Sequence, residues 1–167
     1  QGYTVYAIDL PGHGHSPIDR RAPFDEPYFR EAVIGFIEKL DLNGVTIIGE
    51  SIGGALALTV AAALPQRIAR VFAINPYDYA KGRGMARSSL FGGFVTYASL
   101  LPVIGETVMR LRNFLIMRAV LNGGVADADS IPPALLKEMY LVGNRPGQYR
   151  AFLSLLRNAE TWEVATK

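Results

Sequence analysis

The sequence has 167 residues, half of them apolar, which suffices for one compact domain with a single core and is too short to favour two. Its formal net charge of +2 is too small to indicate a nucleic-acid partner, and no stretch alternates basic with aromatic residues. The absence of cysteine excludes disulfides and thiolate metal sites, while localisation and oligomeric state stay open.

Strands and helices alternate along the first 79 residues. The predicted elements, in chain order, are a strand over 3–10, a helix over 25–40, a strand over 45–48, a helix over 51–64 and a strand over 70–75. β-Branched and aromatic residues favour the strands, and apolar residues at helical spacing favour the helix over 25–40, with Asp25 as its cap and Pro27 in its first turn. This alternation predicts the α/β class, a parallel sheet with flanking helices.

The second half of the chain reads as helical. Apolar stretches over 91–101, 108–121, 131–142 and 149–156 are separated by glycine and proline, with no further strand signal. Residues 1–79 carry 6 basic and 9 acidic side chains, whereas 80–167 carry 11 and 6, which indicates either contact with anionic or lipid-like material or a solvated basic face. The charge-free stretches 51–66 and 88–105 are too short or too rich in glycine, proline and hydroxyl groups for spans, so we expect no membrane contact.

One motif carries the chemistry. Residues 49–54 read G-E-S-I-G-G between a predicted strand and a predicted helix. The G-x-S-x-G spacing suits a sharp turn in which small residues, Gly49 and Gly53, let helix and strand pack closely and expose the Ser51 hydroxyl. The helix N-terminus then offers backbone N–H groups, that of Ile52 first, to a developing oxyanion. The alternative is a glycine-rich turn that binds a phosphate or nothing.

Two further segments complete a resemblance. Asp9-Leu-Pro-Gly-His-Gly-His-Ser16 resembles the D-x-P-G-x-G-x-S loop of the α/β-hydrolase family, and residues 63–71 resemble the exit of its nucleophile helix and the entry to the next strand. With the Ser51 motif, they follow the family order over roughly the first half of the chain. The sequence therefore resembles an internal piece of a serine hydrolase, with a partial α/β-hydrolase core over 1–79 and an α-helical cap over 80–167.

The resemblance implies a hydrolase that acts on a small-molecule, apolar ester through an acyl-enzyme at Ser51, with no metal or organic cofactor. A serine at this turn argues against the dehalogenase and epoxide-hydrolase branches, which the family builds on an aspartate. Esterases, lipases, C–C hydrolases, acyltransferases and haloperoxidase-like enzymes share these residues, so the sequence leaves those activities open.

The family triad runs serine, acid, histidine along the chain. The only histidines, His13 and His15, precede Ser51, so we expect the base to lie outside these 167 residues and the chain itself to be inactive. Asp78 follows the strand after the nucleophile helix and is either the orienting acid or a polar turn residue. Asp9 is expected to shape its loop only. The rival interpretation is a non-catalytic protein that keeps the fold as a binding scaffold.

Overall fold

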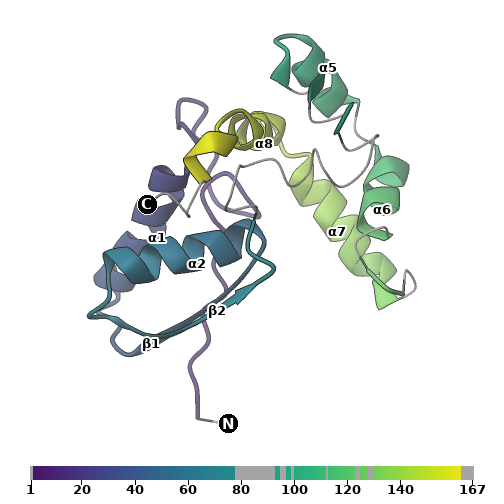
Figure 1. The fold of residues 1–167 in the computed structure, drawn as a ribbon. Helices are drawn as coiled ribbons and strands as arrows, with labels where there is room; N and C mark the ends of the chain where they lie inside the picture. Colours follow the sequence, from purple (N-terminus) through teal and green to yellow (C-terminus); the bar gives the residue numbers. More distant parts are fainter. Residues whose placement is uncertain are drawn as a thin grey trace.

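A computed structural model describes residues 2–77, 93–94, 97–98, 100–111, 113–122, 125–127 and 130–162 (Figure 1). The elements in chain order are α1 (Glu26–Lys39), β1 (Val45–Glu50), α2 (Ile52–Ala63), β2 (Ile68–Ile74), α5 (Ile104–Arg110), α6 (Phe114–Asn122), α7 (Pro133–Gly143), α8 (Gln148–Arg157) and the 3₁₀ helix η2 (Ala159–Trp162).

The two strands form a parallel pair, with Thr46 opposite Arg70 and Glu50 opposite Ile74. Helix α2 connects them and packs on both, and α1 packs against α2 (Figure 1). A parallel pair needs such a crossover because the chain has to return to the same end of the sheet. The predicted α/β class and parallel sheet with flanking helices are confirmed, and the strand bounds differ from the predicted ones by at most two residues.

The predicted strand over 3–10 is wrong. This segment runs past the sheet (Figure 1), and the described part of the chain shows no strand pairing for it. Most of its side chains are exposed, with Tyr3 87% and Val5 83% exposed, while Leu10 packs against the core. Its composition suits a strand, but a strand exists only where a neighbour accepts and donates its backbone hydrogen bonds. Within the described residues, β1 pairs with β2 alone.

Helix α1 follows from its sequence signals. The Asp25 carboxylate accepts a hydrogen bond from the Tyr28 N–H at 3.0 Å, and a proline occupies the first turn, as predicted. Phe29, Val33 and Ile37 recur every four residues and are all buried. They fix the side of α1 that faces α2 and the core.

The second half is helical in its described parts, which hold no strand beyond Ile74. The single stretch predicted over 108–121 is instead two helices, α5 and α6. Asn113 separates them, and its carbonyl accepts from the Met117 N–H at the start of α6, a boundary position that asparagine favours. The stretch over 91–101 is only partly described, with helical residues at 93–94, 97–98 and 100. Among the described helices, none is long and apolar enough to cross a membrane.

Helix α8 joins two hydrophobic clusters. On one side Ala151 and Leu155 share a core with α1, α2 and Trp162, which is fully buried. On the other side Leu153 and Leu156 pack with Met109 of α5. The domain boundary predicted between residues 79 and 80 stays a prediction. Helices α8 and η2, which come after this boundary in the chain, contribute side chains to the core of the first half.

Candidate functional site

Ser51 stands alone between the end of β1 and the start of α2. Its φ of 53° is a conformation that residues other than glycine rarely adopt. The surrounding backbone holds it there: its N–H donates to Ile74 O at 3.0 Å, and its carbonyl accepts from the N–H groups of Ala55 and Tyr77. The residue is exposed, so the turn presents the Ser51 side chain at the surface.

Glycines make the turn possible. A Cβ on Gly49 would lie 2.1 Å from the Gly53 carbonyl oxygen, and one on Gly54 would lie 3.1 Å from both Gly49 O and Pro76 Cα. A Cβ on Gly53, in contrast, would meet nothing within 4 Å. The close approach of helix and strand therefore depends on Gly49 and Gly54, and the role expected for the Gly53 position is wrong.

Ile52 is the first residue of α2. The N–H groups of the first helical turn have no acceptor inside their own helix. The first backbone hydrogen bond at this end of α2 runs from the Ala55 N–H to Ser51 O. The positive end of the helix dipole lies at the same place. The Ile52 N–H therefore has no acceptor within α2, and its role as an oxyanion donor stays a prediction.

Both histidines are engaged in their own loop. His13 Nδ1 lies 3.1 Å from Pro11 O, and the His13 and Phe29 rings form an edge-to-face pair with centroids 5.6 Å apart. The exposed His15 ring has Nδ1 3.8 Å from the Asp9 carboxylate. None of the contacts described for the two rings involves Ser51, so the structure does not bring serine and imidazole together.

Asp9 shapes this loop as expected. Its carboxylate accepts from the His15 N–H at 2.8 Å, and its carbonyl accepts from the Ser16 hydroxyl at 2.7 Å. The carboxyl group lies so close to Gly14 that a Cβ there would be 2.0 Å from the Asp9 Cγ. Asp78 lies outside the described residues, which reach Tyr77 on this side.

Two hollows lie away from Ser51. The first, about 380 Å³, lies open to solvent between α5 and α8, and most of its lining residues carry charged or polar groups: Glu106, Arg110, Tyr149, Arg150, Leu153, Ser154 and Arg157. The second, about 350 Å³, lies between residues 8–19 and α1. Sequence reasoning did not identify the first hollow, and its only signal was the basic excess of residues 80–167. The described residues contain no group of three or more acidic or histidine side chains able to hold a metal ion.

A family model described as alpha/beta hydrolase fold matches residues 1–108. The chain is 32% identical over 105 residues to the dihydrolipoyllysine-residue acetyltransferase component of the acetoin cleaving system of Cupriavidus necator, covering 61% of this chain and 27% of that protein. It is 37% identical over 62 residues to "Putative esterase/lipase 1" of Mycoplasma pneumoniae, covering 37% of this chain and 23% of that protein.

Among solved structures, the epoxide hydrolase CorEH superposes with a TM-score of 0.77 at 20% identity, over 95% of this chain and 59% of that one. At this identity the likeness shows a shared fold. The chain spans about a quarter of the two curated relatives and somewhat over half of the solved chain.

Proposed function

This chain belongs to the α/β-hydrolase fold family, and from that premise we propose that it is part of a serine hydrolase whose nucleophile is Ser51. The observation that carries the proposal is the backbone of Ser51, held at φ 53° where β1 meets α2, in a turn whose close packing requires glycine at positions 49 and 54. The strained backbone of this serine lowers the stability of the fold, and such strain is found mainly at functional sites. At a nucleophile elbow it exposes the hydroxyl for acyl transfer.

The reaction we propose is hydrolysis of a carboxylic ester. A base takes the proton of the Ser51 hydroxyl while Oγ bonds to the ester carbonyl carbon, and the Ile52 N–H donates to the oxyanion that forms. The carbon–oxygen bond to the alcohol then breaks, the alcohol leaves with that proton, and water releases the acid from the acyl-enzyme. No metal or cofactor takes part in these steps.

The base is a histidine outside these 167 residues, and Asp78 is the acid that orients it. This assignment rests on the positions of His13 and His15, which are held by Pro11, Phe29 and Asp9. Tyr77, the residue before Asp78, donates to Ser51 O at 2.8 Å, which supports a place for that acid near the nucleophile.

The proposed substrate is an apolar ester. Exposed apolar side chains in the helical half, such as Phe94, Leu101 and Leu111, support an apolar acyl or alcohol group beside that half. The name of the Mycoplasma relative supports ester chemistry. The fold likeness to an epoxide hydrolase does not carry its activity here, because this chain has a serine where that branch of the family uses an aspartate.

The test is hydrolysis of a nitrophenyl ester, first by the 167-residue chain and then by the product of the complete reading frame. We expect the chain to be no more active than its Ser51→Ala variant, since it lacks the base. In the complete product Ser51→Ala should lower kcat by about 10⁴-fold or more, with Ser130→Ala unchanged as the control.

Trapping gives a second measurement. A slowly released acyl group should appear by mass spectrometry on the peptide that contains Ser51. Full activity of Ser51→Ala would refute the proposal. A complete product without a histidine after Ser51 and without activity would instead favour a binding scaffold, an alternative supported by the histidine contacts described above.

A further inference from the structure

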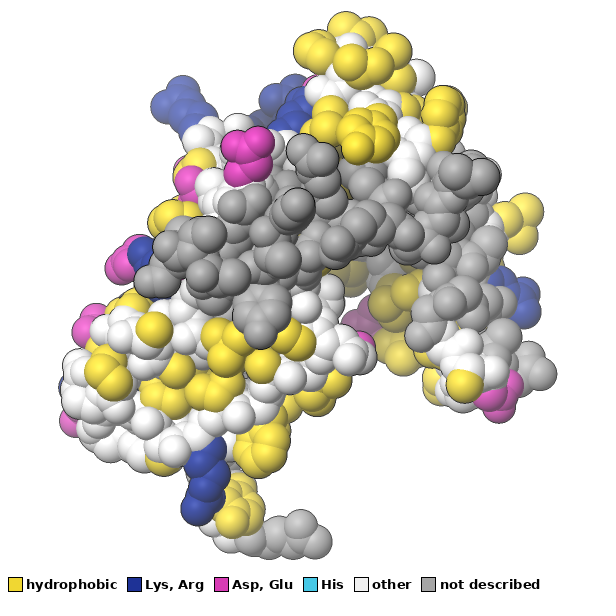
Figure 2. Space-filling view, in the orientation of Figure 1, with side chains coloured by type: hydrophobic (Ala, Val, Ile, Leu, Met, Phe, Trp, Pro, Cys, Tyr) yellow, Lys and Arg dark blue, Asp and Glu magenta, His cyan; other side chains and the backbone are white. Residues whose placement is uncertain are grey.

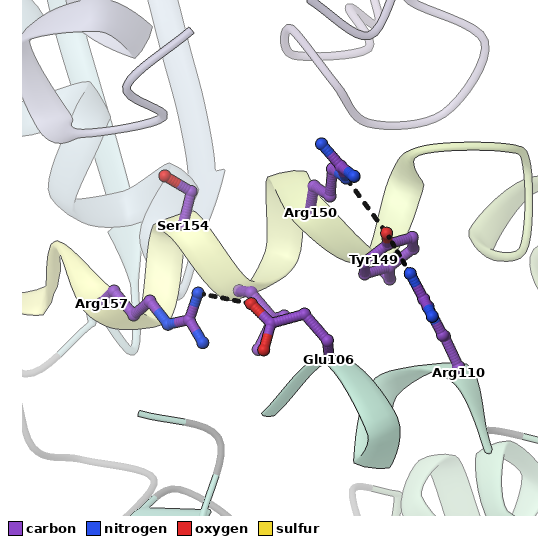
Figure 3. A pocket seen from close by; sticks show the side chains of 7 residues that line it. Glu106, Arg110, Tyr149, Arg150, Ser154 and Arg157 are labelled. Carbon is purple, nitrogen blue, oxygen red and sulfur yellow. Dashed lines mark hydrogen bonds and ion pairs between the residues drawn. The ribbon is translucent and has the colours of Figure 1, made fainter. Parts of the chain in front are cut away.

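The hollow between α5 and α8 is lined by charged side chains from both helices (Figure 3). Glu106 and Arg110 come from α5, whereas Tyr149, Arg150 and Arg157 come from α8. Leu153 lies deeper and is 2% exposed. With three arginines and one glutamate, the lining has a charge of +2.

The three arginines are not equivalent. Arg157 is neutralised by Glu106, with Nη1 2.9 Å from Oε1, and this bond lowers the pKa of Glu106 to about 2. Among the described residues no carboxylate forms an ion pair with Arg110 or Arg150, although the charge of Glu106 also acts on Arg110. Their guanidinium groups instead donate to the same neutral atom, the Tyr149 hydroxyl, at 3.1 and 3.0 Å.

Tyr149 holds the two free charges close together. The centre of its ring lies 5.2 Å from the Arg110 guanidinium carbon and 5.7 Å from that of Arg150. Figure 3 shows both guanidinium groups linked to the Tyr149 hydroxyl. The hydrogen bonds from Arg110 and then Arg150 lower the pKa of the Tyr149 hydroxyl. A neutral phenol can accept these bonds, but it adds no negative charge to offset the two guanidinium groups.

We propose that this hollow is a binding site for a phosphate monoester, whose phosphate group is held by Arg110 and Arg150. A phosphate monoester carries a charge of about −1.5 to −2, which matches the excess of +2, whereas a carboxylate would compensate half of it. Guanidinium groups bind phosphate oxygens in a bidentate way. A hollow of about 380 Å³ also has room for part of the alcohol beyond the phosphate.

The site is independent of the proposed chemistry at Ser51, which lines neither hollow. Two sources present the same group: a soluble phosphate monoester and the headgroup of phosphatidic acid in a membrane. Arg110 and Arg150 are both exposed, so either source can reach them.

Thermal unfolding in increasing inorganic phosphate, at an ionic strength held constant with sodium chloride, tests the site. The informative variant is Arg150→Gln, because Arg150 and Tyr149 both belong to α8 and its loss leaves the Arg110 link from α5 to Tyr149 in place. The matched control is Arg118→Gln on α6, which removes the same charge from another exposed position. Arg150→Lys keeps the charge without the bidentate geometry.

We expect phosphate to raise Tm in the wild type and in Arg118→Gln, and Arg150→Gln to need about tenfold more phosphate for the same rise. Arg150→Lys should lie between them. A second arm measures sedimentation with phosphatidylcholine vesicles, with and without phosphatidic acid. Binding to the acidic vesicles that Arg150→Gln loses, without an effect of free phosphate, assigns the site to the lipid headgroup.

Equal Tm shifts in all variants, or no shift together with no difference between the two kinds of vesicle, would overturn the proposal. The nitrophenyl ester assay of Ser51→Ala is separate from these measurements, so failure of one proposal is distinguishable from failure of the other.

Discussion

Single residues decide whether the turn at Ser51 can form. Its positive φ is held by three backbone hydrogen bonds, to Ile74, Ala55 and Tyr77. None of them involves a side chain, so replacing the Ser51 hydroxyl should leave the turn in place. The steric requirement lies instead at Gly49, whose missing Cβ leaves room for the backbone of Gly53.

Gly49→Ala tests this requirement. The new Cβ would be 2.1 Å from Gly53 O, and neither backbone can move without separating β1 from α2. We expect a loss of at least about 2 kcal/mol in the free energy of unfolding, measured by urea denaturation. Gly53→Ala is the matched control: its Cβ meets nothing within 4 Å, so it should leave stability nearly unchanged or slightly raised. Equal losses in both variants would contradict the packing described for this turn.

The sequence could predict Ser51 because the motif and its flanking strand and helix are local. It could not separate Gly53 from Gly54, since the contacts of Gly54 depend on where Ile74 and Pro76 come to lie, more than 19 residues further along. The hollow between α5 and α8 could not be predicted from the sequence either. Its residues, from Glu106 to Arg157, share no local spacing and meet only because α5 packs on α8.

Among helices and strands, too, features set by local sequence could be predicted, whereas those set by contacts between distant segments could not. Helix α1 was predictable because the residues that form its cap and its buried face all lie within 15 consecutive positions, from Asp25 to Lys39. Residues 3–10 have an equally strong local pattern, yet they form no strand in the structure because pairing depends on a neighbour and not on composition. The break between α5 and α6 at Asn113 also escaped prediction, because the apolar pattern continues through it.

The ion pair between Glu106 of α5 and Arg157 of α8 should make the stability of the fold depend on pH. The hydrogen bond from Arg157 lowers the pKa of Glu106 from 4.5 to about 2. A carboxyl whose pKa is lower in the folded state stabilises the fold above its unfolded pKa, and this contribution disappears as the pH falls through the folded value. The ion pair should therefore act fully at pH 6 to 7 and weaken from about pH 4.5 towards pH 2.

Comparison of the wild type with Glu106→Gln should reveal this dependence in urea unfolding midpoints. We expect the wild type to be the more stable at pH 7, the difference to shrink below about pH 4.5, and the difference to be lost only below about pH 2, where the Glu106 carboxyl is protonated in the folded state. Glu138→Gln, on the exposed side of α7, serves as control and should differ little from the wild type across the range. A difference for Glu106→Gln that is the same at every pH would rule out the ion pair as its cause.

At the scale of the whole molecule, the sheet is covered unevenly. Helices α1 and α2 pack on one side, whereas Ile48 and Phe72, which are register partners on β1 and β2, are 67% and 54% exposed. Figure 2 shows hydrophobic side chains at the surface over the lower part of the molecule, which holds α2 and the strands, and over α5 at the top. Parallel strands are normally covered on both faces, so this face is unusually apolar for a surface.

We therefore expect the 167-residue chain to self-associate through the sheet face and the double variant Ile48→Thr, Phe72→Thr to reduce that association. Threonine keeps a high strand propensity while it removes apolar surface, so the fold should be retained. Analytical ultracentrifugation over a concentration series measures the effect, with circular dichroism to verify the fold. Leu115→Gln, which removes a 72% exposed apolar side chain from α6, is the control. If that control reduced association and the double variant did not, the contact surface would lie on the helical half instead of the sheet.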